Sequence, residues 1–98
     1  MNQISHERDA FKLDVHGAYL RRTDLSGANL EGANLSGANL TDAILRGANL
    51  KDAILKGTIL RGADLTDAKN LTRAQLETAI IDDRTRLPAL VADTPMVK

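Results

Sequence analysis

The sequence predicts an all-β solenoid, a chain that winds repeatedly around one axis. Three observations carry this prediction. Leucine recurs at every fifth residue from Leu20 to Leu65, alanine or threonine stands two residues before each of these leucines, and all seven glycines stand directly before that small residue. A fixed repeat is a stronger predictor of the fold than the helix or strand propensity of single residues, because each unit must bury its apolar face against its neighbours.

A period of five fits neither common secondary structure. In an α-helix, successive leucines would be rotated by about 140°, so that no apolar stripe would form. In a flat strand, an odd spacing would place alternate leucines on opposite faces. A short extended segment followed by a bend gives every fifth residue the same inward direction. Glycine at a fixed place in the unit supplies the bend, because it tolerates φ > 0.

The run over 17–67, which contains GANLEGANLSGANL and KDAILKGTILRGADL, resembles the pentapeptide-repeat family. In that family a central Leu or Phe follows Asn or Asp, which in turn follows Ala. The resemblance implies a right-handed quadrilateral β-helix of four units per coil, with the central and small residues pointing inward. It implies that the structural core is formed by ten leucines: Leu20, Leu25, Leu30, Leu35, Leu40, Leu45, Leu50, Leu55, Leu60 and Leu65.

The composition suits such a narrow coil. Apolar residues make up 43% of the chain but aromatic residues only 2%, because leucine and alanine supply most of the apolar set. The chain has no cysteine, which excludes disulfide bonds and thiolate chemistry. Stability is therefore expected to come from stacked coils and from caps over their open ends.

The N-terminal end is expected to carry the weaker cap. Residues 1–12 form the predicted N-terminal segment, in which Phe11 is the largest apolar side chain available to cover the first coil. The repeat domain is expected over 13–68, starting with a degenerate unit that places Leu13 and Val15 at the small and central positions. An uncovered edge would leave backbone groups unpaired, so we expect either a monomer or a homodimer through this end.

The C-terminal end is expected to carry a helical cap. Beyond Asp67 the five-residue register slips, and Thr72 with Gln75 forms a capping-box pattern. The cap is expected over 69–88, as a short helix followed by an extended piece. Residues 89–98 show no periodicity and are expected to form a flexible tail.

The sequence offers no constellation for chemistry. His6 and His16 lie near the N-terminus and outside the regular units, so a pairing with serine would require the fold to bring the two together. The glycines match neither the phosphate loop nor the dinucleotide fingerprint. Aspartates such as Asp42 and Asp52 occupy outward positions. We expect their carboxylates to be solvated there and not to bind a metal ion. We expect no catalytic residue, no cofactor, no metal and no enzymatic activity.

The outward positions change along the array. The residue after the central leucine is polar or acidic in one turn of four units, from Ser26 to Thr41, and basic in the next four. The residue before the leucine changes from asparagine to isoleucine at three units. These positions form either a candidate protein-interaction surface or β-branched packing on a pleated wall. The residues concerned are Ile44, Ile54, Ile59, Arg46, Lys51, Lys56 and Arg61.

The net charge of zero argues against some classes of partner. The 13 basic and 13 acidic side chains cancel, which disfavours a polyanionic partner. Nucleic-acid binding is also disfavoured because aromatic stacking residues are scarce. The polar start lacks the features of a secretory signal, and no apolar run approaches the length of a membrane span. We therefore expect a cytoplasmic chain without membrane contact.

The predicted function is a non-enzymatic structural or protein-interaction module with an unidentified protein partner. The family resemblance implies one alternative, because some members imitate duplex DNA and bind DNA gyrase. Those members are longer rods with an acidic surface. The neutral charge and the short array of this chain disfavour that alternative.

Overall fold

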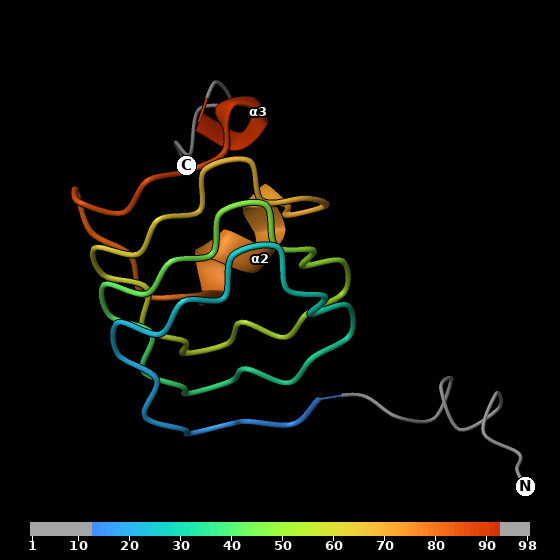
Figure 1. Ribbon diagram of the computed structural model, residues 1–98, viewed down its shortest axis with the longest axis vertical. Helices are drawn as coiled ribbons and strands as arrows, with labels where there is room; N and C mark the ends of the chain where they lie inside the picture. Colours follow the sequence, from blue (N-terminus) through green and yellow to red (C-terminus); the bar gives the residue numbers. More distant parts are fainter. Residues whose placement is uncertain (1–12, 93–98) are drawn as a thin grey trace, which may run out of the picture.

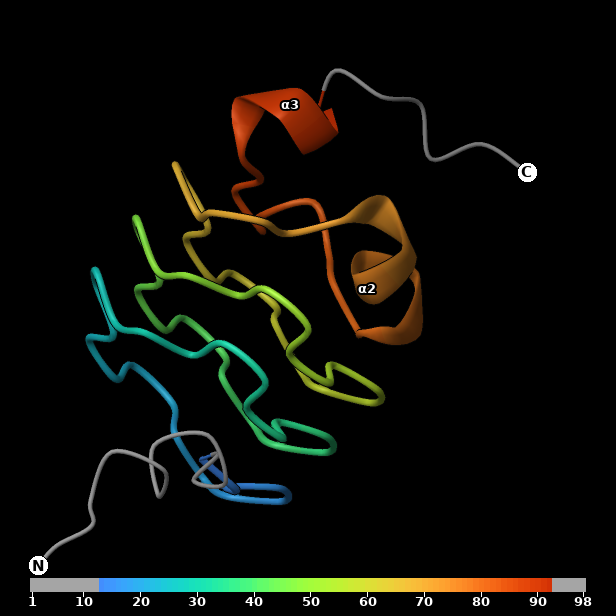
Figure 2. The ribbon, with the colours of Figure 1, turned by 90° about the vertical axis from the view of Figure 1, so that its right-hand side faces the viewer.

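The computed structural model describes residues 13–92, which wind into a stack of coils (Figure 1). Helix α2 (Arg73–Thr78) lies beside the last coil and helix α3 (Ala89–Ala92) lies beyond it (Figure 2). The predicted N-terminal segment, 1–12 with Phe11, lies outside the described residues, as does 93–98 of the predicted tail. The prediction of a solenoid is confirmed for the repeat domain.

Parallel bridges join residues on neighbouring coils, twenty positions apart within the repeats and 21 or 22 apart at Ile59–Ile80 and Asp64–Arg86. The N–H of Leu35 donates to the Ile54 carbonyl at 2.9 Å, and the N–H of Ile54 donates to the Ala33 carbonyl at 2.8 Å. Four such ladders define four sides, numbered here in chain order. Side 1 contains Asp14, Asn34 and Ile54; side 2 contains Tyr19, Asn39, Ile59 and Ile80; side 3 contains Asp24, Ile44, Asp64 and Arg86; side 4 contains Asn29, Asn49 and Lys69.

Tight turns form the corners between the sides. The Leu45 carbonyl accepts the N–H of Ala48 at 3.1 Å, and Gly47 between them has φ of 71°. A positive φ at the third residue is the mark of a type II turn, in which glycine is favoured. Four corners carry another residue in this conformation, with φ near 60°: Arg22, Asp42, Asp52 and Asp67.

The core consists of stacked leucines with alanines between them. Leu40 and Leu65 are 0% exposed, and Ala33 and Ala48 are equally buried. Eight of the ten predicted core leucines, Leu30 to Leu65, are buried as expected. The prediction was too broad at the first coil, where Leu20 and Leu25 are only half-buried.

The predicted C-terminal helix is present as α2. Thr72 Oγ1 accepts the Gln75 N–H at 3.1 Å, and Gln75 Oε1 accepts the Thr72 N–H at 2.8 Å. These two bonds complete the capping box that the sequence predicted. Leu76 points into the coil and is 1% exposed, so α2 closes the end of the core above side 1.

An extended segment closes two of the other sides. Ile80 bridges Ile59 on side 2, and Arg86 bridges Asp64 on side 3.

The prediction of a flexible tail from residue 89 was wrong for its first residues, because α3 forms there and Val91 is 8% exposed. The aperiodic sequence concealed this contact, since a single apolar side chain leaves no pattern.

The secondary structure differs from that of a conventional all-β protein. Neighbouring coils are joined through isolated bridges, and no longer strand is present among residues 13–92. Each side spans one unit, so a turn follows before a strand can lengthen. Neither helix of this part of the chain has the length and apolar content needed to cross a lipid bilayer.

Candidate interaction surface

Asparagine or aspartate before the central leucine fixes the corner that follows. Asn34 Oδ1 accepts the N–H of Ser36 at 3.1 Å and its hydroxyl at 2.6 Å. This Asx-turn gives the corner N–H a partner that the coil itself does not supply. The same bond to the N–H two residues later forms at Asp14, Asp24, Asn29, Asn39, Asn49 and Asp64.

Isoleucine removes this bond at three units. The side chains of Ile44, Ile54 and Ile59 contain no acceptor, so the next corner loses its Asx-turn. Each of these corners carries a basic residue, whose stem is long enough to bring its charge into water. Within the described part of the chain, no side chain accepts a hydrogen bond from the backbone N–H of Arg46, Lys56 or Arg61.

The three isoleucines lie on three different sides. Ile54 is on side 1 and is 48% exposed, and Ile59 is on side 2, where it is half-buried next to Ile80. Ile44 is on side 3, opposite Ile54, and is 37% exposed. The predicted surface is therefore split, because Ile44 cannot contact the same flat partner as Ile54.

The four predicted basic residues occupy four different corners. Arg46 is held by Asp64, with Nη1 to Oδ2 at 3.2 Å. Lys51, Lys56 and Arg61 are exposed, and none forms an ion pair within residues 13–92. Their charges are consequently available to a ligand, whereas that of Arg46 is partly neutralised.

Five predicted residues form one continuous surface over sides 1 and 2. Ile54 lies between the corners of Lys51 and Lys56, and Ile59 lies between the corners of Lys56 and Arg61. We call this set the Ile54 face: Lys51, Ile54, Lys56, Ile59 and Arg61.

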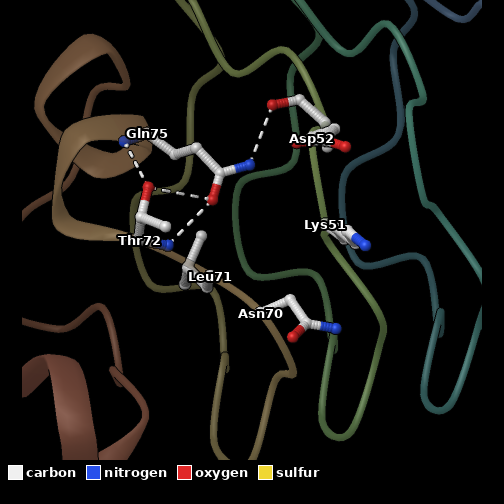
Figure 3. Close-up of a pocket in the computed structure, with 7 residues that line it drawn as sticks. Lys51, Asp52, Asn70, Leu71, Thr72 and Gln75 are labelled. Atoms are coloured by element: carbon white, nitrogen blue, oxygen red, sulfur yellow. Dashed lines mark hydrogen bonds between the residues drawn. The ribbon is translucent and has the colours of Figure 1, made fainter.

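A cleft of about 460 Å³ adjoins the Ile54 face at the corner of Lys51 (Figure 3). Asn70, Leu71 and Thr72 line its other wall. The Gln75 side chain crosses the cleft and is fully engaged in hydrogen bonds to backbone carbonyls and to Thr72 (Figure 3). The polar groups at the bottom of the cleft are thus paired, and the cleft has no free buried group that would select a ligand.

His16 forms a largely exposed pair with Asp14, and His6 lies outside the described residues. His16 Nδ1 lies 2.6 Å from Asp14 Oδ1, and this hydrogen bond lowers the pKa of Asp14 and raises that of His16. Ser36 stands at the corner one coil above His16, but its hydroxyl donates to Asn34. The serine is therefore not activated by the histidine, as a nucleophile would require.

The other shifted groups are turn-forming aspartates. The hydroxyl and N–H of Ser26 lower the pKa of Asp24. Burial opposes ionisation of Asp64, but its hydrogen bonds from Thr66 and Arg46 outweigh burial and lower its pKa. No group of three carboxylate or imidazole side chains within 13–92 is arranged to hold a metal ion.

Comparison with known protein families identifies the repeat that builds these coils. A family profile of pentapeptide repeats fits residues 14–52 and 43–83, with eight copies of the repeat. The chain belongs to the pentapeptide-repeat family. No curated protein sequence matches it.

Two solved pentapeptide-repeat proteins are similar to this one. A protein from the cyanobacterium Cyanothece 51142 is 34% identical with a TM-score of 0.66, over 79% of this chain and 52% of that chain. A protein from the Arabidopsis thaliana thylakoid lumen is 26% identical with a TM-score of 0.30, over 78% and 55%. The chain thus spans about half the length of both. The family and the cyanobacterial structure imply a right-handed β-helix.

Sequence reasoning missed two features of this pentapeptide-repeat surface. The Asx-turns are encoded by Asn or Asp before the central leucine, and a Ser or Thr two residues later adds a hydroxyl bond, as at Asp64 and Thr66; this signal was present in the sequence. The contact of Gln75 with the coil was not encoded locally, because its acceptors lie more than twenty residues earlier.

Proposed function

We propose that this pentapeptide-repeat chain is a non-enzymatic protein-interaction module of the cytoplasm, and that its partner binds the Ile54 face. The observation that carries the proposal is the 48% exposure of Ile54, at a position where the coil below has an asparagine bound into a turn. Ile54 is flanked by two lysines without ion pairs in residues 13–92. A partner surface with an apolar centre and an acidic rim complements this arrangement.

The competing interpretation is that the outward isoleucines are apolar because they pack against side chains of the neighbouring coils. It fits Ile59 better than Ile54, because Ile59 lies in a ladder below Ile80 and two such side chains stabilise each other across neighbouring strands. Ile54 bridges only Asn34, and α2 replaces the next strand above it. Ile54 therefore has the weaker structural reason to be apolar, which favours a role in binding.

The experiment is affinity capture with matched variants. Ile54→Asn removes the apolar side chain and supplies the residue that the repeat carries elsewhere. Ile44→Asn makes the same change on the opposite side. We expect Ile54→Asn to reduce recovery of the captured partner by about tenfold, as for a central contact residue, and Ile44→Asn to leave it unchanged. Equal recovery with both variants contradicts the proposal.

The DNA-mimic alternative is tested separately. Mimicry of a polyanion requires a sustained negative surface, whereas Lys51, Lys56 and Arg61 give three corners of one coil a positive charge. We expect no inhibition of DNA gyrase in a supercoiling assay; inhibition at micromolar protein would favour the alternative. Recovery of the chain in a fraction other than the cytoplasm would contradict the proposed location.

A further inference from the structure

The two ends of the described solenoid differ. In the first coil Val15, Leu20 and Leu25 are half-buried, whereas Leu40, one coil above Leu20, is 0% exposed. Leu13, which takes the small inward position, is 41% exposed. The first coil therefore leaves several inward apolar side chains incompletely covered within residues 13–92.

The backbone edge of the first coil is also unpaired in this part of the chain. Tyr19, Asp24 and their equivalents on sides 1 and 4 bridge only to the coil above. Among residues 13–92 nothing accepts their N–H groups or donates to their carbonyl groups. Each side therefore has one residue whose N–H and carbonyl both point away from the stack. At the other end, Ile80 and Arg86 pair with the corresponding groups.

Exposed edges of this kind are templates for pairing. In an antiparallel pair, two opposed residues exchange both of their backbone hydrogen bonds. A residue with a free N–H and a free carbonyl on the same edge is suited to that exchange with a like residue. Another edge with the same square outline and the same free groups would satisfy all four sides together.

The corner charges of the first coil specify how two such edges fit. Arg21 and Arg22 follow side 2, and Glu31 follows side 4, so the basic and acidic corners are diagonally opposite. His16 and Ser26 occupy the other diagonal. A two-fold axis along the His16–Ser26 diagonal places each basic corner over the acidic corner of a second copy, and it makes the facing sides antiparallel.

We propose that the first coil is a self-association surface, and that its occupant is a second copy of this chain bound head to head. The axis pairs side 1 with side 2 of the partner and side 3 with side 4. Asp14 then exchanges backbone bonds with the partner's Tyr19, and Asp24 with the partner's Asn29. Arg22 faces the partner's Glu31 twice, and the half-buried Leu20 and Leu25 become covered. This closed, isologous contact uses a surface distinct from the Ile54 face.

The test is sedimentation of the full chain from micromolar to millimolar concentration, with charge-swap variants. We expect a monomer–dimer equilibrium in the wild type. Glu31→Arg alone and Arg22→Glu alone each create two like-charge contacts, so each should weaken dimerisation by about tenfold. The double variant reverses both corners and should recover wild-type dimerisation.

Three outcomes overturn the proposal. One is a wild-type chain that is monomeric throughout this concentration range. The second is a double variant no better than the single variants. The third is amide exchange at Tyr19, Asp24 and Asn29 that does not slow as the chain concentration rises. Circular dichroism of each variant separates loss of dimer from loss of fold.

Discussion

The side-chain amide of Gln75 donates to the backbone carbonyl of Ala53 at 2.9 Å. One coil below, the equivalent carbonyl of Ala33 accepts the N–H of Ile54 at 2.8 Å. Gln75 also donates to the Leu50 carbonyl at 2.8 Å. A single side chain thus takes the place of the missing strand above side 1 and holds α2 against the end of the core.

Substitution of Gln75 should destabilise the cap. Gln75→Ala removes both donors and half of the capping box, so we expect the free energy of unfolding to fall by about 1–3 kcal/mol in urea denaturation. Gln75→Glu keeps the acceptor for Thr72 but places an oxygen against two carbonyls, and it should be at least as damaging. A Gln75→Ala variant as stable as the wild type would show that α2 is held by Leu76 alone.

The corners give a second prediction. Gly47 has φ of 71°, and an added Cβ would meet nothing within 4 Å, so the cost of Gly47→Ala is conformational. We expect that variant to lose about 1–2 kcal/mol. Asp52 holds the same conformation with φ of 59°, so the opposite change, Asp52→Gly, should be neutral or stabilising. Thermal melts of both variants check the sign, and a stabilised Gly47→Ala would refute the turn assignment.

The difference in leucine burial between the coils predicts that Leu→Ala substitutions destabilise the second coil more than the first. Leu40 is fully buried, so Leu40→Ala should cost about 2–5 kcal/mol. Leu20 is half-buried on the same side of the first coil. Leu20→Ala should therefore lower the free energy of unfolding clearly less than Leu40→Ala, when both are measured in dilute monomer. Chemical denaturation of the two variants at one low protein concentration makes the comparison. Equal losses would mean that the first coil is as well covered as the second.

Stability should fall at both ends of the pH range. Asp14, Asp24, Asp64 and Asp82 have pKa values below their ordinary 3.8, so their contribution is present above that pH and is lost as the pH falls through the lowered values. The pKa of His16 lies above its ordinary 6.5, so its contribution is complete below that value and is lost as the pH rises.

Denaturation midpoints from acid to mildly alkaline pH test this prediction. Because the Asp14–His16 pair is largely exposed, we expect the alkaline change to be the smaller of the two. His16→Gln should remove the alkaline change, together with the part of the acid change that comes from Asp14, and leave the part that comes from Asp24, Asp64 and Asp82 in place. A His16→Gln variant with the wild-type alkaline profile would contradict the assignment to this histidine.

The sequence was sufficient for the coil and its core. The five-residue spacing of leucine could only be satisfied by winding, and the capping box at Thr72 located α2. The sequence was insufficient where one contact depends on distant residues. Val91 packs at the end of the stack only because α2 and the segment before Pro88 bring it there, and no period marks it.

The candidate surface was predictable residue by residue but not as a patch. Ile44 and Ile54 have the same place in the repeat, and a basic residue stands two positions after each, so the sequence made them equivalent. Two units separate them along the chain, and in a four-sided coil that spacing puts them on opposite sides. Ion pairing distinguishes them further, because Arg46 is bound to Asp64 whereas Lys56 has no partner within residues 13–92.

The most direct test of the central claim is the free energy of unfolding of Ile54→Asn. If Ile54 is exposed for a partner, the restored Asx-turn bond to Lys56, worth about 1 kcal/mol, offsets the loss of a half-buried apolar side chain, also worth about 1 kcal/mol. The variant should then unfold within about 0.5 kcal/mol of the wild type. A loss of about 1.5 kcal/mol or more would show that Ile54 is part of the wall and would contradict its assignment to a binding surface.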